Sequence, residues 1–297
     1  MKHITVIGTG YVGLVSGAGL SDFGNRVICA DIIKKKIDLL NKNKIPIYEP
    51  GLDEIVHRNT KANRLSFTTD LGKSIRESEV IFIAVGTPQS ASGQADISAV
   101  KTVAKLIGEN LQNKKIICTK STVPIGTGKL VSEIINDNKP PDGEFAYVSN
   151  PEFLREGSAI KDFLWPDRVV IGAESDWAFE MMQDVYRPLY LNETPIIHTT
   201  IETAELIKYA SNAFLALKIS YINEISSLCE AVGADVNIVA KAMGSDGRIS
   251  PKFLHAGPGY GGSCFPKDTL ALAFQAEKKK INVRTVKAAI ETNNYQK

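Results

Sequence analysis

Short apolar runs alternate with helical periodicity over the first two hundred residues of the chain. The runs are rich in β-branched residues, and several are apolar throughout, as expected for parallel strands that are covered on both faces. Strand–helix alternation over this length predicts an α/β fold built on a doubly wound parallel sheet. The predicted strands are Ile4–Ile7, Arg26–Cys29, Leu65–Phe67, Val80–Val85, Lys115–Cys118, Ala146–Val148, Arg168–Ile171 and Pro195–His198.

A different pattern begins after residue 200. Residues 202–232 contain neither proline nor glycine, and their apolar positions recur at helical spacing, which predicts one long connecting helix. We therefore expect two domains, residues 1–200 and a small all-helical domain of residues 201–297. The last helical pattern nearly reaches Lys297 without a stop signal, so we expect that more protein could follow. The shorter predicted helices are Asp235–Met243, Thr269–Lys279 and Val283–Asn293.

The composition narrows the possible functions. The formal net charge is +2, with 23% charged and 43% hydrophobic residues, which is typical of a globular protein and argues against a dedicated nucleic-acid binder. Four cysteines without a CxxC spacing and four histidines without ligand spacing predict neither a disulfide framework nor a metal site. No stretch approaches the ~20 apolar residues that span a bilayer, and no convincing signal-peptide cleavage site follows the N-terminus. We expect a cytoplasmic protein.

A glycine-rich turn, Gly8-Thr-Gly-Tyr-Val-Gly13, follows the first predicted strand and opens a helical pattern. The second strand ends at Asp31, 18 residues after Gly13, where a carboxylate can bind both hydroxyls of an adenosine ribose. This context predicts a Rossmann-like dinucleotide site, with the pyrophosphate at the helix N-terminus. Asp31 would repel a 2′-phosphate and favours NAD, while Lys34, Lys35 and Lys36 leave NADP open. The predicted contacts at the turn are Gly8, Gly10, Tyr11, Val12 and Gly13.

Three further loops follow predicted strands: Val85–Pro88, Ser121–Pro124 and Ser149–Glu156. Each loop alone is more typical of a turn than of a site. Together they predict a ligand site, because ligands of open α/β sheets bind at the carboxyl ends of the strands.

The most informative segment is Gly257–Asp268, which reads GPGYGGSCFPKD. Four glycines within six residues let the backbone approach a ligand closely. Cys264 follows them, with Lys267 and Asp268 close by in sequence. A cysteine attacks as its thiolate, which nearby cations and backbone N–H groups stabilise, so this setting favours a nucleophile over a cysteine in a buried turn. The other cysteines, in apolar patterns, are interpreted as core residues: Cys29, Cys118 and Cys229.

Lys208 and Asn212 are four residues apart, and hence on one face of the predicted long helix, in an otherwise apolar window. They are either a lysine and an asparagine on a wet stripe, or a cation and an amide donor directed at a developing oxyanion. The spacing alone leaves both interpretations open.

Six motifs together resemble the UDP-glucose 6-dehydrogenase family, within the UDP-glucose/GDP-mannose dehydrogenase group. The resemblance implies a four-electron oxidation of the C6 alcohol of a nucleotide sugar to a carboxylate, with two NAD⁺ and one water. It further implies that Cys264 traps the intermediate aldehyde as a thiohemiacetal, which the second oxidation converts to a thioester. The motifs cover essentially the whole chain: GTGYVGL at 8–14, GTP at 86–88, STVPIGT at 121–127, NPEFLREG at 150–157, KYASN at 208–212 and GYGGSCFPKD at 259–268.

The resemblance also implies roles for other residues. Lys208 and Asn212 would stabilise the oxyanion. Asp268 and Thr122 would hold a water that serves as base or hydrolytic nucleophile, and Glu152 would act in thioester hydrolysis. Besides the turn, the expected NAD contacts are Asp31, Lys36, Thr87, Thr122, Glu156 and Lys267. The expected contacts of the sugar nucleotide are Glu152, Phe153, Leu154, Arg155, Lys208, Asn212, Arg248, Phe253, Leu254, His255, Ala256, Gly257 and Gly261.

Two structural expectations and several alternatives accompany this resemblance. Arg248 matches a residue that reaches the neighbouring subunit's substrate, which implies a homodimer through the long helix. Family members continue into a third, UDP-binding domain that this sequence lacks, so we expect the chain to bind NAD and to oxidise UDP-glucose weakly or not at all. Phe265 and the form NPEFLREG favour UDP-glucose, but GDP-mannose and UDP-N-acetylmannosamine stay open. So do a two-electron β-hydroxyacid dehydrogenase, which needs no cysteine, and an NAD-binding module without turnover.

Overall fold

The computed structural model describes residues 1–90 and 93–297, and its chain divides into two compact units. The first unit comprises Met1–Thr87 and Asp96–Leu206, and the second comprises Pro88–Ala95 and Ile207–Lys297. The division falls within the long helix α9 (Ile201–Val232), so the first residues of this helix belong to the first unit.

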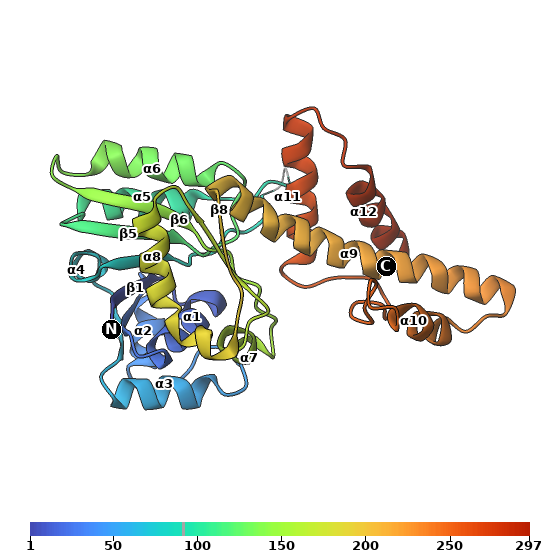
Figure 1. Ribbon diagram of the computed structural model, residues 1–297, viewed down its shortest axis with the longest axis horizontal. Coiled ribbons are helices and arrows are strands. Elements are labelled where there is room, and N and C mark those ends of the chain that lie inside the picture. Colours follow the sequence, from blue (N-terminus) through green and yellow to red (C-terminus); the bar gives the residue numbers. More distant parts are fainter. Residues whose placement is uncertain (91–92) are drawn as a thin grey trace. The chain divides into compact units, whose positions relative to one another are not determined.

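An eight-stranded sheet forms the first unit, in the order β3-β2-β1-β4-β5-β6-β7-β8 (Figure 1). All eight predicted strands are confirmed. Strands β1 to β6 pair in parallel, and β7 pairs with β8 in parallel, so the predicted doubly wound parallel sheet is confirmed. The pair of β6 and β7 is antiparallel, which the sequence did not predict. The strands are β1 (His3–Ile7), β2 (Arg26–Ala30), β3 (Leu65–Thr68), β4 (Val80–Ile83), β5 (Lys114–Thr119), β6 (Glu144–Ser149), β7 (Val169–Ala173) and β8 (Ile196–Thr199).

The chain reverses its direction between β6 and β7. Strictly parallel neighbours need a connection that crosses over the sheet and returns to the starting edge. After β6 the chain instead runs through residues 150–158 into the short helix α7 (Ala159–Leu164), whose Phe163 contacts Phe23 at the end of α1. β7 then runs back along β6, and Ser149 at the end of β6 pairs with Gly172 of β7.

Helices cover both faces of the sheet, as the apolar strands require (Figure 1). Along β4, Phe82 belongs to one hydrophobic core, while Ile81 and Ile83 belong to the other. The first core is closed by α1 (Tyr11–Asp22), α2 (Lys34–Leu40), α3 (Leu52–Lys61), α7 and α8 (Asp176–Val185), and a 3₁₀-helix, Arg187–Asn192, follows α8. The second core is closed by α4 (Leu71–Glu77), α5 (Ser98–Glu109) and α6 (Thr127–Asn138).

The second unit consists mainly of helices, as predicted: the remainder of α9, α10 (Val236–Gly244), α11 (Phe265–Lys278) and α12 (Arg284–Gln296). The predicted start of the third of these was wrong, because α11 begins four residues before Thr269. Pro266 lies in its first turn, where the missing N–H of proline leaves no intrahelical bond unmade. Lys267 and Asp268 therefore lie on a helix rather than in a loop.

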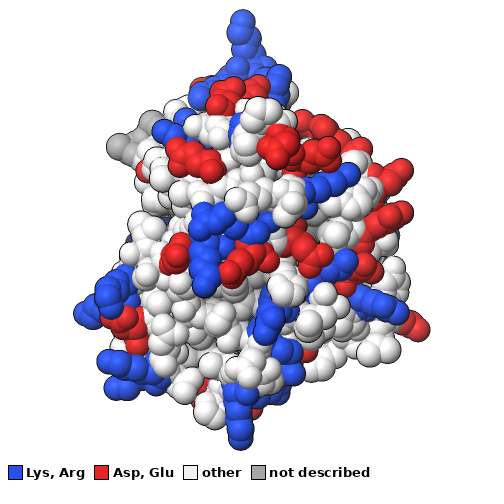
Figure 2. Space-filling view, turned by 90° about the vertical axis from the view of Figure 1, so that its left-hand side faces the viewer, with Lys and Arg blue, Asp and Glu red and all other residues white. Residues whose placement is uncertain are grey.

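Two general properties bear on possible partners. On the face drawn in Figure 2, lysine and arginine side chains are interspersed with aspartate and glutamate, and no large patch of one sign dominates it. Within residues 1–90 and 93–297, none of the helices combines the length and the apolar character that crossing a bilayer requires.

Candidate active site

The predicted cofactor residues of the first unit meet at one edge of its sheet. Because β1, β2, β4 and β5 are parallel neighbours, their carboxyl ends lie side by side. These ends lead into Gly8, Asp31, Thr87 and Thr122. The strand order reverses at β1, because β2 lies on one side of it and β4 on the other. Open α/β sheets bind their ligands at such a point.

The glycine turn is shaped by close backbone contacts. Gly8 has φ of +104°, and a Cβ atom added to it would lie 2.6 Å from the carbonyl oxygen of Ala84. A Cβ on Gly13 would lie 1.9 Å from the carbonyl oxygen of Gly8, so the start of α1 presses directly on the turn. Around Gly10 there is open space, and no side chain caps this helix N-terminus. The turn therefore offers free N–H groups and room for a diphosphate.

Asp31 is buried and already positioned. Its Oδ2 accepts hydrogen bonds from Thr9 N and Thr9 Oγ1 at 2.8 and 2.7 Å, and its Oδ1 accepts one from Ile33 N at 2.9 Å. Burial opposes ionisation, but these bonds and Lys36, with Nζ 4.0 Å away, hold the pKa of Asp31 below its ordinary value. The carboxylate stays charged and keeps lone pairs for ribose hydroxyls, which fits the predicted role.

The loops after β4 and β5 are bonded to each other. Thr87 Oγ1 donates to the carbonyl of Thr122 at 2.8 Å, and Ser121 Oγ donates to that of Val85 at 2.7 Å. One residue that was not predicted from the sequence holds the end of the loop after β5. Glu205, in the first turns of α9, accepts hydrogen bonds from Gly126 N at 2.6 Å and Gly128 N at 2.8 Å, at the start of α6.

The NPEFLREG segment starts from a buried polar junction after β6. Asn150 Nδ2 donates to the carbonyl of Val170 at 2.7 Å. Its Oδ1 accepts from Tyr186 Oη at 2.6 Å and from the buried Lys120 Nζ at 3.1 Å. Asn150 therefore bonds to β7, to the end of α8 and to the residue that follows β5, and its position is fixed.

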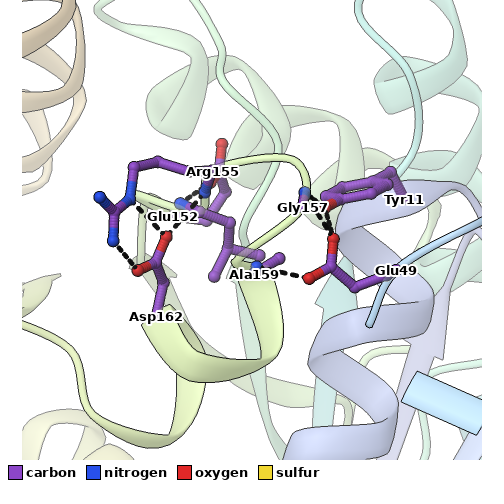
Figure 3. A network of polar contacts seen from close by, with 8 residues as sticks. Tyr11, Glu49, Glu152, Arg155, Gly157, Ala159 and Asp162 are labelled. Atoms are coloured by element: carbon purple, nitrogen blue, oxygen red, sulfur yellow. Dashed lines mark hydrogen bonds and ion pairs between the residues drawn. The ribbon is translucent and has the colours of Figure 1, made fainter. Parts of the chain in front are cut away.

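Figure 3 shows two carboxylates that hold the rest of this segment. Asp162 accepts from the backbone N of Arg155 at 2.9 Å and pairs with the guanidinium of the same residue. Glu49 accepts from Gly157 N and Ala159 N, each at 2.8 Å, and from the hydroxyl of Tyr11. Among the other predicted residues, Glu152 is buried and accepts from Leu154 N, Phe153 lies against Arg168, and Glu156 is exposed.

Three of the predicted chemical residues of the second unit are buried on α9 and in the first turn of α11, and we call them the buried cluster. Lys208, Asn212 and Asp268 are all less than 9% exposed. Asn212 Nδ2 donates to Asp268 Oδ2 at 2.7 Å, and Lys267 Nζ pairs with Asp268 Oδ1 at 2.6 Å. The Asp268 carboxylate thus joins α9 to the first turn of α11. The arrangement contradicts the interpretation of Asn212 as an asparagine on a wet stripe.

Cys264 is the residue that immediately precedes α11. It is exposed, whereas Cys29, Cys118 and Cys229 are buried, so the three core assignments are confirmed. Its carbonyl accepts from Asp268 N at 2.8 Å, which places the thiol one helical turn from the buried carboxylate. The N-terminal end of a helix favours negative charge nearby. No side chain caps this end of α11.

Side-chain amides hold the glycine loop that precedes Cys264. Asn223 Oδ1 accepts from Gly257 N at 2.8 Å, and Gln296 Nε2 donates to the carbonyl of Gly257 at 2.8 Å. Asn293 bonds to both the N–H and the carbonyl of Tyr260, at 2.6 and 3.1 Å. These three amides were missed; a buried asparagine within a helix is the available signal.

The remaining predicted substrate residues precede this loop or belong to it. Phe265 contacts the rings of Phe253 and Tyr260, with centroids 5.9 and 6.3 Å apart, so the loop packs on the start of α11. Leu254 is buried, Ala256 is half-buried, and His255, Gly257 and Gly261 are exposed. Arg248 is exposed and pairs with Asp246.

The described residues contain no group of three or more His, Cys, Asp or Glu side chains that could hold a metal ion.

Comparison with known proteins identifies the family. Residues 2–190 match the NAD binding domain of the UDP-glucose/GDP-mannose dehydrogenase family, and residues 202–295 match its central domain. The chain belongs to this family. Its first unit accordingly contains the NAD-binding domain, in agreement with the free glycine turn and the charged Asp31.

Relatives cover the chain almost completely. It is 56% identical over 297 residues to the UDP-glucose 6-dehydrogenase of Rhizobium meliloti, covering 99% of this chain and 68% of the relative. It is 52% identical to UDP-glucose 6-dehydrogenase TuaD of Bacillus subtilis, covering 100% of this chain and 64% of the relative. A UDP-glucose dehydrogenase structure from Pyrobaculum islandicum superposes with a TM-score of 0.96 at 40% identity, covering 99% of this chain and 68% of that one. The chain thus spans about two thirds of the length of these relatives.

Proposed function

We propose that the chain carries the reaction centre for the NAD⁺-dependent oxidation of UDP-glucose to UDP-glucuronate, through a thioester on Cys264. The observation that carries the proposal is the exposed cysteine at the start of α11, one turn from the buried cluster of Lys208, Asn212 and Asp268. The names of the relatives at 56% and 52% identity favour UDP-glucose over other nucleotide sugars.

The need for a covalent step follows from the chemistry. The C6 alcohol loses a hydride and a proton to become an aldehyde, which has no alkoxide to expel a second hydride. Addition of the Cys264 sulfur to the carbonyl carbon forms a thiohemiacetal, and its oxyanion can lose the second hydride to give a thioester. Water then adds to the thioester carbonyl, the C–S bond breaks, and the carboxylate leaves while the thiol is restored. When bound at the glycine turn, NAD⁺ would supply the hydride acceptor for each of the two oxidations.

The buried cluster supplies the electrostatics of these steps. Lys208 and Asn212 stabilise the negative oxygen at C6, because a cation and an N–H donor in a water-poor setting interact strongly with developing charge. One N–H of Asn212 is used by Asp268, and the second is available for the substrate. Asp268, fixed by Asn212 and Lys267, orients the water that serves as base or hydrolytic nucleophile. The buried lysine and aspartate thereby have a catalytic role as well as a structural one.

The family resemblance supports further roles for residues of the first unit. Gly8, Gly10, Gly13 and Asp31 hold NAD⁺, with Thr87 and Thr122 on the neighbouring loops. Glu152 is proposed to assist thioester hydrolysis, and Thr122 to hold the water that takes part in it. The residues proposed to hold the nucleotide sugar are Phe153, Leu154 and Arg155 in the first unit and the loop Phe253–Gly261 in the second.

We also infer a homodimer through α9. Four large apolar residues on this helix recur at spacings of seven or four and remain exposed: Phe214 62%, Tyr221 45%, Leu228 58% and Val232 68%. Such a stripe on one helix face is suited to a second copy of the same helix. Sedimentation equilibrium tests this inference: the wild type should sediment as a dimer and Phe214→Glu as a monomer, and a monomeric wild type contradicts it.

The decisive experiment measures NADH by stopped-flow absorbance after mixing the chain with NAD⁺ and UDP-glucose. We expect two NADH per uronate and a sugar adduct on Cys264 in the intact mass. Cys264→Ser should abolish the adduct and the second NADH, because a serine hydroxyl is a much weaker nucleophile than a thiolate. Cys229→Ser, the same exchange at a buried cysteine of α9, is the matched control and should keep both.

Other outcomes discriminate the alternatives. Two NADH per product from Cys264→Ser would contradict the thioester. One NADH per product from the wild type, with no dependence on Cys264, would indicate a two-electron dehydrogenase. Binding of NAD⁺ without NADH from UDP-glucose, but with NADH from GDP-mannose or UDP-N-acetylmannosamine, would reassign the sugar.

A further inference from the structure

Glu49 is a buried carboxylate to which the proposed reaction gives no role. It lies in the turn Tyr48-Glu49-Pro50-Gly51 before α3, where its carbonyl accepts from Leu52 N at 3.1 Å. Gly51 has φ of +80°, and Pro50 restricts the backbone, so the turn has little freedom. The Glu49 side chain is only 5% exposed.

Three donors satisfy this carboxylate, and none of them is a cation. Oε1 accepts from Ala159 N at 2.8 Å, and Oε2 accepts from Gly157 N at 2.8 Å and from the hydroxyl of Tyr11 (Figure 3). No ion pair involving Glu49 occurs in the part of the chain that the structure describes. The Tyr11 oxygen also lies 3.2 Å from Gly157 N. A buried carboxylate without a cation is tolerable only when such donors are held in place.

These bonds join two segments that belong to different parts of the site. Tyr11 lies in the dinucleotide turn and is the first residue of α1. Gly157 and Ala159 end the segment that begins at Asn150 and contains Glu152 and Arg155. Gly157 has φ of +85°, so its N–H is presented by a backbone conformation that few other residues adopt. Burial and the bond to Glu49 raise the pKa of the Tyr11 phenol, which therefore remains a donor.

We propose that Glu49 is a positioning residue that links the dinucleotide turn, through Tyr11, to the segment Glu152–Ala159, so that NAD⁺ bound at the turn rigidifies this segment. The part of the inference that concerns the nucleotide sugar rests on the proposed function, because that function assigns Glu152–Arg155 to sugar binding. The consequence is positive coupling: each ligand binds more tightly when the other is present, since the ordering of the segment is shared.

The same segment contains a carboxylate that provides the matched control. Asp162 also accepts from a backbone N–H of the segment, that of Arg155, but it has its own cation in the same residue and no bond to Tyr11. Asp162→Asn should loosen the segment without cutting its connection to the turn. Glu49→Gln should do both, because an amide offers one acceptor oxygen where two are used.

Hydrogen–deuterium exchange of the peptide covering residues 155–162, with and without saturating NAD⁺, tests the connection. In the wild type we expect NAD⁺ to slow exchange at Gly157 and Ala159 by about tenfold, the effect of strengthening one hydrogen bond to a charged group. Glu49→Gln should exchange faster and lose the response to NAD⁺, whereas Asp162→Asn should keep it. Tyr11→Phe leaves both backbone bonds of Glu49 in place, so it should keep basal protection and lose only the response.

The outcomes are separable from those of the proposed function. A full NAD⁺ response in Glu49→Gln, or an equal loss in Asp162→Asn, overturns the positioning role. If Glu49→Gln fails to fold, Tyr11→Phe decides alone, and a retained response overturns the proposal. Absence of both an NADH burst and a sugar adduct on Cys264 with every nucleotide sugar refutes the proposed function, yet the exchange response to NAD⁺ still tests Glu49. Where UDP-glucose binds, the NAD⁺ dissociation constant should fall on its addition in the wild type and stay constant in Glu49→Gln.

Discussion

The dinucleotide edge of the first unit is the set of loops at the carboxyl ends of β1, β2, β4 and β5. The contacts that hold it differ from those that hold the glycine loop before Cys264 in the second unit. At the edge, backbone atoms at the ends of buried parallel strands fix the geometry, and Gly8 and Gly13 are required because backbone lies within 3 Å of any added Cβ. In the second unit, the glycine loop before Cys264 is held by Asn223 and Asn293 from helices and by Gln296. A local motif therefore suffices to specify the first site, whereas the second depends on side chains distant in sequence.

Two alanine substitutions in the glycine turn should have the largest effects, one on folding and the other on NAD⁺ binding. Gly13→Ala places a Cβ 1.9 Å from the carbonyl oxygen of Gly8, and we expect a loss of at least about 3 kcal/mol and a poorly folded first unit. Gly10→Ala meets open space, so we expect a folded unit that binds NAD⁺ weakly, because the methyl group fills the room for the diphosphate. Circular dichroism and NAD⁺ titration distinguish the two. Equal NAD⁺ affinity in Gly10→Ala and wild type would show that the pyrophosphate does not bind at this turn.

The dinucleotide edge also depends on one side chain that is distant in sequence, that of Glu205. The pKa of this carboxyl group makes its contribution to stability depend on pH. Burial raises the pKa of Glu205 from 4.5 to about 7, with Glu202 adding to the effect and the N–H groups of Gly126 and Gly128 opposing it. Because the folded pKa lies above the unfolded one, the neutral form stabilises the fold. This contribution, about 3 kcal/mol, is complete below pH ~4.5 and is lost as the pH rises to about 7.

Urea unfolding of wild type and Glu205→Gln between pH 4 and pH 8 measures this contribution. The glutamine has no proton to lose, so the variant should gain about 3 kcal/mol relative to the wild type over the interval. Glu202→Gln is the matched control on the same helix turn, and it should move the transition of the wild-type curve to lower pH. A constant difference between wild type and Glu205→Gln would show that the carboxyl titrates with an ordinary pKa.

The contrast between the two regions also explains what could be predicted from the sequence. All eight strands and the long helix were predictable because periodicity and β-branched runs report local burial. The glycine turn with Asp31 was predictable because Gly8, Gly13 and Asp31 all lie within one strand–helix–strand unit, at a recognisable spacing. Glu49 and Glu205 were not, since their partners lie 108 to 110 and 77 to 79 residues away and no local pattern announces a carboxylate that binds backbone N–H groups. The antiparallel direction of β7 was not predictable either, because the apolar pattern of a buried strand does not depend on the direction in which the strand runs.

The smallest effect should come from the amide that holds the cysteine loop. Asn293→Ala removes the bonds to the N–H and the carbonyl of Tyr260 and leaves both groups without that partner, which should lower the unfolding free energy by about 2 kcal/mol. Asn294→Ala, at the exposed neighbouring position, should change it by less than about 0.5 kcal/mol. Exchange of the Tyr260 amide should accelerate only in Asn293→Ala, while NAD⁺ affinity stays at the wild-type value because the dinucleotide turn is untouched. A protected Tyr260 amide in Asn293→Ala would mean that the glycines and the packing of Phe265 hold the loop by themselves. In that case the second region, like the first, would be specified by its own motif.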